Sequence, residues 1–294
     1  MILVVLSGGI GSQLCQFAAG YSLAKERNCK LVLDASFFNS GQATKPFKLD
    51  LIMDISNKII IKNIWLSRLL RFFFILQSYC SFNILKYSKV NIKNPIKYKV
   101  FKKAKNYFIN GHANNMSYYE KYLDEILSKF NKSKIVSDKK TIGIHVRKGD
   151  QANSFMDFCD ADYYIRSIKK IIHLNNLNIK EIKFLIFCEE IEWPKNNIKL
   201  DGVNFSYVIG DDNTATEDFK LMLNCSHLII PNSYYSWWVA AYINNKKKGT
   251  IICPDLWWDR LSVSKLNLYP KNWTVLNTNV EINKNPEYIE LEKK

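Results

Sequence analysis

The start of the chain alternates short apolar runs with a helical repeat of apolar positions. An apolar run at residues 2–6 breaks at a glycine-rich turn, and apolar residues then recur at three- and four-residue intervals between Leu14 and Ala24. A second apolar run, residues 30–34, ends in the acid Asp34. The order strand, glycine-rich turn, helix and strand predicts a parallel βαβ unit.

The second half of the chain repeats this alternation more clearly. Apolar runs predict strands at residues 141–146, 183–188, 203–208, 227–230 and 250–253. Helical repeats lie between these strands, at residues 162–172, 217–225 and 233–244. Continuous apolar strands that alternate with helices are typical of a buried parallel sheet.

A polar stretch at residues 131–140 separates the two patterns. The chain has 294 residues, which is enough for two domains, and hydrophobic residues make up 47% of it, which predicts packed cores. We therefore place an N-terminal domain at residues 1–138 and a C-terminal domain at residues 139–294. The predicted fold class is α/β, with two Rossmann-like domains whose parallel sheets face a cleft.

The N-terminus and the cysteines both indicate the compartment. The N-terminus lacks the basic segment and the long apolar stretch of a secretory signal. Seven cysteines are scattered without a C-x-x-C pair or zinc-ligand spacing, and most lie in apolar runs. We expect reduced, mostly buried thiols in a cytoplasmic protein.

Positive charge is concentrated in one region. The formal net charge is +15, and residues 55–119 contain twelve Lys and Arg but no Asp or Glu. An aromatic, apolar run lies within them, at residues 64–76, but its charge-free part is shorter than the roughly 20 residues that a transmembrane helix needs. Two interpretations stay open: peripheral contact with an anionic membrane, on the inner face of the plasma membrane, or a solvated basic face. The region matches no nucleic-acid-binding motif, so we expect no nucleic acid partner.

Polar clusters follow four predicted strands of the second half, at the edge where ligands of open parallel sheets bind. These clusters lie at residues 145–150, 188–190, 231–233 and 254–255. Arg147 and Lys148 offer fixed positive charge for a diphosphate. Asn232 and Ser233 stand where a helix begins, which indicates either an anion site or a plain helix cap. With Arg147 on a neighbouring strand end, we favour the anion site.

Six short segments follow one another along the chain. They are GGIGSQLCQFA at residues 8–18, GHANNMSYY at 111–119, HVRKGD at 145–150, FCDADYY at 158–164, FCEEIEW at 187–193 and NSYYSWW at 232–238. Each is a weak signal alone, but together and in this order they resemble the bacterial α-1,2-fucosyltransferases of glycosyltransferase family 11. The resemblance implies a GT-B-like fold and an inverting, metal-independent transferase that uses GDP-fucose.

The same resemblance implies roles for individual residues. Arg147 would bind the β-phosphate and stabilise the departing GDP, Asp218 would contact the nucleoside, and the serine-led turn would hold the phosphates. The predicted donor-binding residues are Gly9, Gly11, Gln13, His145, Arg147, Lys148, Asp218, Asn232, Ser233, Tyr234, Tyr235 and Ser236. Ser12 replaces the family's Asn and Lys148 replaces its second Arg, so the resemblance determines the donor better than the acceptor.

Arg147 and Asp150 are the predicted catalytic residues. Arg147 and the helix start would stabilise the leaving diphosphate by preorganised electrostatics. Asp150 is the candidate base for the incoming hydroxyl, with a salt bridge to Arg147 or Lys148 as an equal alternative. His145 either supports Arg147 or contacts donor oxygens, and a buried strand histidine is the alternative. Asp160 directly precedes a helix and is interpreted as its cap, so we expect no metal and no other cofactor.

The resemblance implies transfer of L-fucose from GDP-fucose to a hydroxyl, O2 of a galactoside, in a bacterial surface glycan such as an O-antigen, free or lipid-linked. Alternatives are another GDP-sugar-dependent transferase, or a basic membrane-associated nucleotide-binding module without transferase activity. A dinucleotide-dependent dehydrogenase fits poorly, because Leu14 stands where its fingerprint needs a third glycine.

Overall fold

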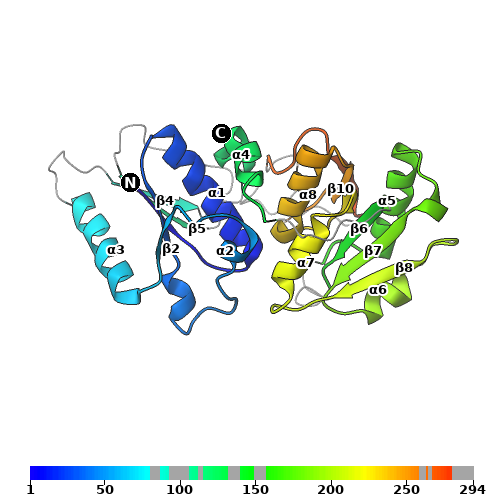
Figure 1. The fold of residues 1–294 in the computed structure, drawn as a ribbon, viewed down its shortest axis with the longest axis horizontal. Coiled ribbons are helices and arrows are strands. Elements are labelled where there is room, and N and C mark those ends of the chain that lie inside the picture. Colours follow the sequence, from blue (N-terminus) through cyan, green and yellow to red (C-terminus); the bar gives the residue numbers. More distant parts are fainter. Residues whose placement is uncertain are drawn as a thin grey trace. The chain divides into compact units, whose positions relative to one another are not determined.

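The structure is a computed structural model (Figure 1). It describes residues 1–79, 87–92, 106–111, 115–131, 140–148, 157–257, 263 and 267–279. Contacts divide the chain into two compact units, Met1–Phe130 and Asn131–Lys294. The expected domain boundary, after residue 138, lies outside the described residues.

The described part of unit 1 is built on a five-stranded parallel sheet. Its strands, in the order β3-β2-β1-β5-β4, are β1 (Ile2–Val5), β2 (Leu31–Asp34), β3 (Ile59–Ile61), β4 (Tyr87–Ile92) and β5 (Asn106–Gly111). The central strand β1 pairs with β2 on one side and with β5 on the other. Helix α1 (Ile10–Glu26) connects β1 to β2, which confirms the predicted βαβ unit.

Helices α1 and α3 (Ile64–Tyr79) pack on opposite faces of this sheet. On one face, a Cβ added at Gly20 of α1 would lie 2.3 Å from Val4 Cγ2, so glycine allows α1 to approach β1 closely. On the other face, Leu70 of α3 packs against a cluster that includes Leu3. Since side chains alternate along a strand, β1 gives each helix its own apolar surface.

Asp34, at the end of β2, fixes α3 to the sheet. One oxygen of its buried carboxylate accepts a hydrogen bond from Ser67 Oγ at 2.6 Å and lies 2.8 Å from Arg71 Nη2. The other oxygen accepts from Ser36 N–H at 3.1 Å. A buried carboxylate with these partners is a structural anchor. The dehydrogenase alternative, in which this acid would contact a ribose, therefore does not fit.

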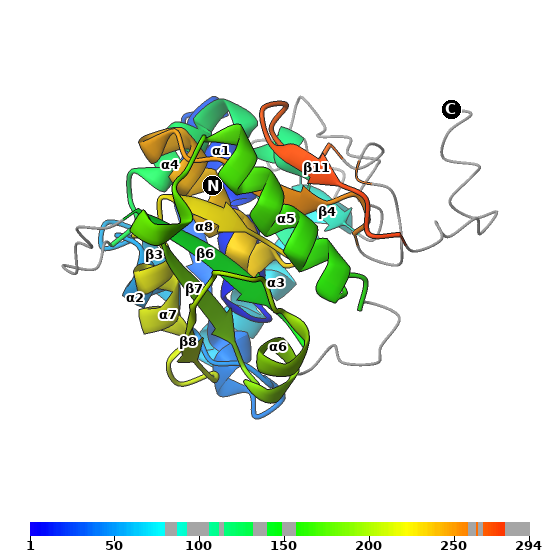
Figure 2. The same cartoon turned by 90° about the vertical axis from the view of Figure 1, so that its right-hand side faces the viewer.

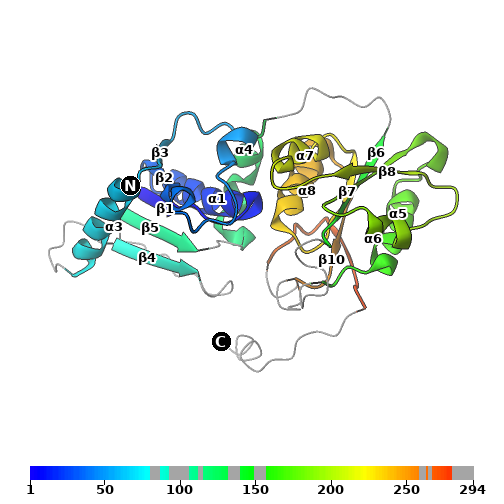
Figure 3. The same cartoon turned by 90° about the horizontal axis from the view of Figure 1, so that it is seen from below.

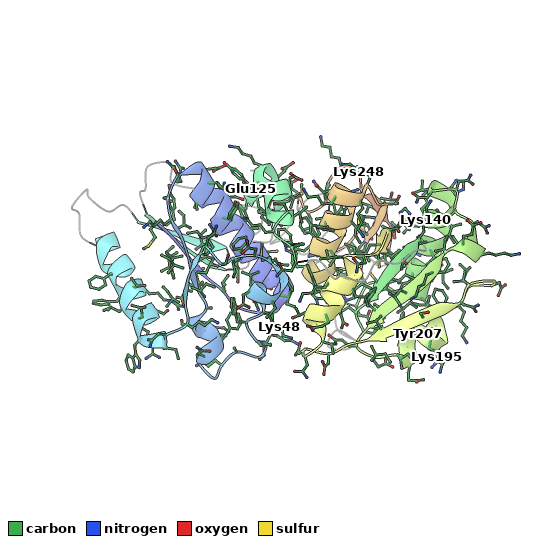
Figure 4. The ribbon with its side chains drawn as sticks, in the orientation of Figure 1. Lys48, Glu125, Lys140, Lys195, Tyr207 and Lys248 are labelled. Atoms are coloured by element: carbon green, nitrogen blue, oxygen red, sulfur yellow. The ribbon has the colours of Figure 1, made fainter. Side chains whose placement is uncertain are left out.

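Short helices complete the described part of unit 1. They are η1 (Ser36–Asn39), α2 (Leu49–Ile52), η2 (Met116–Tyr118), η3 (Glu120–Tyr122) and α4 (Leu123–Leu127). Glu125 of α4 accepts a hydrogen bond from Tyr21 and lies 2.7 Å from Lys25 Nζ, both on α1 (Figure 4). These contacts hold α4 against the C-terminal half of α1.

The described part of unit 2 contains a six-stranded parallel sheet. In the order β11-β10-β9-β6-β7-β8, its strands are β6 (Thr141–Val146), β7 (Lys183–Cys188), β8 (Phe205–Ile209), β9 (His227–Ile229), β10 (Ile251–Pro254) and β11 (Thr274–Leu276). Figure 2 shows β6, β7 and β8 side by side. The five strands predicted in this half are confirmed, and β11 is additional.

Helices cover both faces of the unit 2 sheet. They are α5 (Ala161–Leu174), η4 (Ile179–Glu181), α6 (Glu192–Asn197), α7 (Ala215–Met222) and α8 (Tyr234–Lys247). Helices α5 and α6 lie on one face, and α7 and α8 lie on the other (Figures 1 and 3). This double cover explains the continuous apolar strands of the sequence. None of the six described cysteines forms a disulfide, and only Cys29 among them is not buried, as predicted.

Strand order reverses at the centre of the unit 2 sheet. From β6 the chain runs outward through β7 and β8, and it then returns to β9 on the other side of β6. In open parallel sheets, ligands bind beyond the carboxyl ends of the strands at such a reversal. The loops that leave β6 and β9 are therefore where a ligand site is expected.

Candidate functional site

Arg147 and Ser233 lie on the two loops at this reversal. Ile144 of β6 pairs with Ile229 of β9, so the two strands end next to each other. Arg147 directly follows β6, and a backbone hydrogen bond from Arg147 reaches the phenol of Tyr164 on α5. The sheet topology thus confirms that these strand ends are neighbours, as the sequence predicted.

Ser233 is the N-cap residue of α8, but its side chain does not cap the helix. Its backbone is extended, and its carbonyl accepts the first helical hydrogen bond, from Trp237 N–H at 2.9 Å. The Ser233 hydroxyl is buried, with the residue 1% exposed, and it makes no hydrogen bond with any described residue. The plain-cap interpretation is therefore wrong. A buried hydroxyl without a partner costs about 1–3 kcal/mol, so its position calls for an explanation.

Asn232 is bonded to the segment that leads into α5. It is buried, and its backbone forms a hydrogen bond to the Cys159 thiol, whose pKa is nevertheless raised by burial. Tyr163 of the same helix donates to Ile230 O at 2.7 Å. The loop after β9 is therefore fixed at two points before α8 begins.

The residues that follow Ser233 make contacts within unit 2. Tyr234 packs edge-on against Trp257, with ring centroids 5.1 Å apart. Tyr235 donates to Ala215 O at 2.7 Å and joins α8 to α7, and burial raises its pKa well above the usual range. Ser236 Oγ donates back to Ser233 O at 3.3 Å. These side chains shape the turn. Their predicted contact with the sugar donor stays a prediction.

Lys148 is already paired. Its ammonium group forms a salt bridge with Asp157 and lies 4.2 Å from the centroid of the Trp193 ring. Its side chain is only 10% exposed. The salt bridge neutralises much of the positive charge that Lys148 was expected to offer to a diphosphate. Arg147 is therefore the stronger candidate for binding a diphosphate.

Asp218 and His145 lie near Tyr235. Asp218, in the first turn of α7, accepts a hydrogen bond from Thr214 Oγ1 at 3.0 Å, and its charge contributes to the raised pKa of Tyr235. The His145 ring, half-buried on β6, lies 5.6 Å from the Tyr235 ring. Both predicted donor residues therefore belong to the same neighbourhood as the α8 start.

Gly210, which the sequence analysis missed, makes room for Asp218. A Cβ added at Gly210 would lie 1.9 Å from Asp218 Oδ2. The residue directly follows β8, so the carboxylate packs against the end of that strand. A glycine two residues beyond a predicted strand is the signal that could have drawn attention to it.

The predicted donor residues of unit 1 lie at its own strand reversal, where the turn after β1 leads into α1. Gly8 adopts the left-handed conformation with φ +73°, and Gly9 is the N-cap of α1 without a side-chain cap. Gly11 is buried in the first turn of the helix. These glycines let a tight turn connect strand and helix.

Gln13 and Gln16 hold this turn in place. Both are fully buried. Gln13 Nε2 donates to Gly8 O and to Pro46 O, both at 2.9 Å, and its Oε1 accepts from Lys48 N–H at 3.1 Å. Both N–H groups of Gln13 therefore bind backbone oxygens of unit 1. The predicted contact of Gln13 with the sugar donor stays a prediction. Gln16, which the sequence analysis missed, accepts from Ser7 N–H at 2.9 Å.

Two carboxylates that resemble a metal motif have structural partners. Asp160 is the N-cap of α5 and accepts from Tyr163 N–H at 2.8 Å, which confirms the predicted cap. Asp162 pairs with Arg166 Nε at 2.6 Å. The predicted base, Asp150, lies outside the described residues, so its role stays a prediction.

The two parallel-sheet units define a GT-B-like glycosyltransferase fold. NodZ, a Bradyrhizobium α-1,6-fucosyltransferase solved after soaking with GDP-fucose, superposes with a TM-score of 0.50 at 13% identity, covering 82% of this chain and 92% of NodZ. A glycosyl transferase family 9 protein from Veillonella parvula gives a TM-score of 0.51 at 11% identity, covering 98% and 90%. At these identities the likeness concerns the fold alone.

The sequence identifies the family. The model of glycosyl transferase family 11 matches residues 45–277, so the chain belongs to this family. An Escherichia coli alpha-1,2-colitosyltransferase is 28% identical, over 93% of this chain and 98% of the relative. The Escherichia coli O-antigen biosynthesis glycosyltransferase WbnK is 25% identical, over 90% of this chain and 97% of the relative. The protein is therefore a glycosyltransferase, as the resemblance implied.

Proposed function

We propose that this glycosyltransferase moves L-fucose from GDP-fucose to O2 of a galactoside in a bacterial surface glycan. The observation that carries the proposal is the buried Ser233 hydroxyl, which has no described partner and stands at the start of α8 beside the strand end that bears Arg147. A diphosphate is the kind of ligand that would engage both groups, because it accepts hydrogen bonds and carries negative charge.

The leaving group is where these residues would act. When the glycosidic bond to GDP breaks, negative charge develops on the β-phosphate. The guanidinium of Arg147 would bind its oxygens through two parallel hydrogen bonds, and the Ser233 hydroxyl would donate a third. Donors that are already in place before the reaction stabilise such charge without reorganisation.

Asp218 would bind the nucleoside. Its carboxylate lies at the same edge of the sheet, held by Thr214 and given space by Gly210. A carboxylate accepts hydrogen bonds from the N–H groups of guanine or from ribose hydroxyls. This contact would favour a guanosine nucleotide without contributing to the chemical step.

The acceptor hydroxyl needs a base, and we propose Asp150, with a salt bridge to Arg147 or Lys148 as the alternative. Inversion places this base on the face of the sugar opposite the leaving diphosphate. His145 would support the donor-side contacts. We propose that no metal is required, because Arg147 and the helix start would supply the charge stabilisation that a metal supplies elsewhere.

The six cysteines of the described chain form no disulfide, which suits a reducing compartment, so we place the reaction in the cytoplasm. The similarity to the O-antigen glycosyltransferase WbnK supports a surface glycan as acceptor. A glycan of this kind is assembled either free or on a lipid carrier.

A second donor is favoured by one observation. The colitosyltransferase relative is 28% identical over nearly its whole length. Colitose is the 3-deoxy counterpart of L-fucose, and the diphosphate and nucleoside contacts proposed above would bind GDP-colitose equally well. The difference between the two donors is a single hydroxyl, whose recognition requires a dedicated polar partner.

The test is a transfer assay with GDP-fucose and GDP-colitose against a panel of galactosides, with and without EDTA, followed by NMR of the product. We expect fucose transfer that persists in EDTA and gives an α-1,2 linkage. Preference for GDP-colitose would establish the second donor instead. Loss of transfer in EDTA that Mg²⁺ restores would overturn metal independence, and a different linkage would overturn the proposed acceptor position.

A further inference from the structure

Helix α3 exposes a stripe of large apolar side chains. Trp65, Leu66, Leu69, Phe72 and Phe73 are between 48% and 75% exposed. Their spacing of i, i+1, i+4, i+7 and i+8 places them on one face of the helix. They are half of the ten exposed large hydrophobic residues described in the chain. A patch of this kind marks an interaction site more often than isolated surface apolar residues do.

The opposite face of α3 is fixed to the sheet. Ser67 and Arg71 bind the buried Asp34 carboxylate, and Leu70 packs against the core cluster. The helix therefore cannot rotate to bury its apolar stripe without breaking a buried ion pair. The stripe is a fixed feature of the surface of unit 1.

The charge around the stripe indicates which surface it contacts. Helix α3 contains two arginines and no acid. Arg71 is used inside the fold, whereas the Arg68 guanidinium lies 5.3 Å from the centroid of the exposed Trp65 ring. Lys62, just before the helix, has a 59% exposed side chain whose ammonium group lies 4.0 Å from an Asp50 carboxylate oxygen and 5.4 Å from the centroid of the Phe47 ring. An apolar stripe bordered by cations complements a surface that is apolar inside and anionic outside.

The same charge disfavours a second copy of this chain as the partner. A symmetric pairing through α3 would bring together two copies of a helix that carries arginine and no acid. Like charges across an interface cost energy and suppress the pairing. An anionic lipid surface instead gains from every nearby Lys or Arg.

We propose that α3 docks the protein on the surface of an anionic bilayer. No helix in the described part of the chain is both long and apolar enough to cross a bilayer, so α3 would lie in the plane of the interface. Its aromatic side chains enter the boundary between headgroups and acyl chains, and Arg68 and Lys62 face the lipid phosphates. The proposal goes beyond the transferase reaction and does not depend on it.

The test is flotation of the full chain with vesicles of phosphatidylcholine alone or mixed with phosphatidylglycerol. We expect binding to the anionic vesicles only, with a loss at high salt. The combined variant Trp65→Gln/Leu69→Gln/Phe72→Gln removes the centre of the stripe. We expect it to lower the partition coefficient at least about 100-fold, because each apolar side chain contributes strongly to interfacial binding.

A matched control replaces three exposed apolar residues outside α3, which are 48–54% exposed. The variant Leu51→Gln/Ile59→Gln/Leu174→Gln should bind vesicles as the natural chain does. Circular dichroism and thermal unfolding of both variants check that they fold. The double variant Lys62→Gln/Arg68→Gln should weaken binding to anionic vesicles while leaving the apolar stripe intact.

Three outcomes would overturn the proposal. These are absence of binding to anionic vesicles by the natural chain, equal loss in the two triple variants, and a dimer by analytical ultracentrifugation that the α3 variant alone abolishes. The last would assign the stripe to a protein interface. Transfer to a water-soluble galactoside should be equal in all variants, so failure of docking and failure of the transferase function are distinguishable.

Discussion

The turn after β1 and the turn after β9 have the same position in their sheets, but their buried polar side chains differ in hydrogen bonding. Each lies at a strand reversal, each leads from a parallel strand into a long helix, and neither helix has a side-chain cap. In unit 1, Gln13 and Gln16 are buried and their amides bind neighbouring backbone groups. In unit 2, the buried Ser233 hydroxyl has no described partner.

We interpret the turn after β1 as a scaffold, and the turn after β9 is the binding site that we propose. A turn whose polar groups are all satisfied internally gains stability but has little left to offer a ligand. A turn that keeps a buried donor unsatisfied is less stable than it could be, and it gains when a ligand arrives. The two turns should therefore respond to mutation in opposite ways, one in stability and the other in ligand binding.

The largest effect is expected for Arg147→Ala. Loss of the guanidinium should lower kcat/KM for GDP-fucose by about 10³-fold, as for other preorganised groups that stabilise developing charge. The Tm should stay unchanged, because the side chain is only half-buried. Arg147→Lys keeps the charge without the planar fork and should recover part of the rate. Near-normal turnover of Arg147→Ala would show that the diphosphate binds elsewhere.

Gln13→Ala should have the next largest effect, and on stability. The change removes three hydrogen bonds between the fully buried Gln13 amide and the backbone of Gly8, Pro46 and Lys48, which should lower the free energy of unfolding by about 3 kcal/mol. Denaturant unfolding measures this. Gln42→Ala, at an exposed glutamine, is the control and should stay within about 0.5 kcal/mol of the natural chain. A stable Gln13→Ala protein that has lost only GDP binding would instead make Gln13 a ligand contact.

The smallest effect is expected for Ser233→Ala. Removal of a buried hydroxyl without a partner should leave the Tm unchanged or raise it, whereas GDP affinity should fall about 10-fold, because a hydrogen bond to a charged group is lost. Isothermal titration calorimetry measures the affinity. Ser22→Ala is the matched control, since the Ser22 hydroxyl is also buried without a described partner but lies in the middle of α1. If Ser233→Ala destabilises the fold as Gln13→Ala does, the contrast between the two turns disappears.

The strands and the neighbourhood of Arg147 could be predicted because they depend on local pattern and on the geometry of parallel sheets. Continuous apolar runs located the strands of the second half, and the geometry of parallel sheets predicted that the ends of β6 and β9 lie next to each other. The Asp160 cap was also predictable, since capping acts over three residues.

Contacts between distant segments could not be predicted. Gln13 binds Pro46, and Asp34 binds Arg71, across separations of 33 and 37 residues that no periodicity encodes. The space that Gly210 leaves for Asp218 depends on how α7 returns to the sheet. The absence of a Ser233 cap was equally hidden, because serine at that position usually does cap a helix.

The placement of the central strands has a consequence for how the protein is made. Strand β1 is synthesised about 100 residues before its neighbour β5, with which it pairs at Ile2 and Tyr107. Strand β6 is likewise made long before its neighbour β9, with which it pairs at Ile144 and Ile229. Parallel sheets with such distant pairings form slowly and leave apolar strand edges uncovered meanwhile. The yield of native enzyme should therefore depend strongly on the temperature of synthesis and on chaperones that shield the nascent chain.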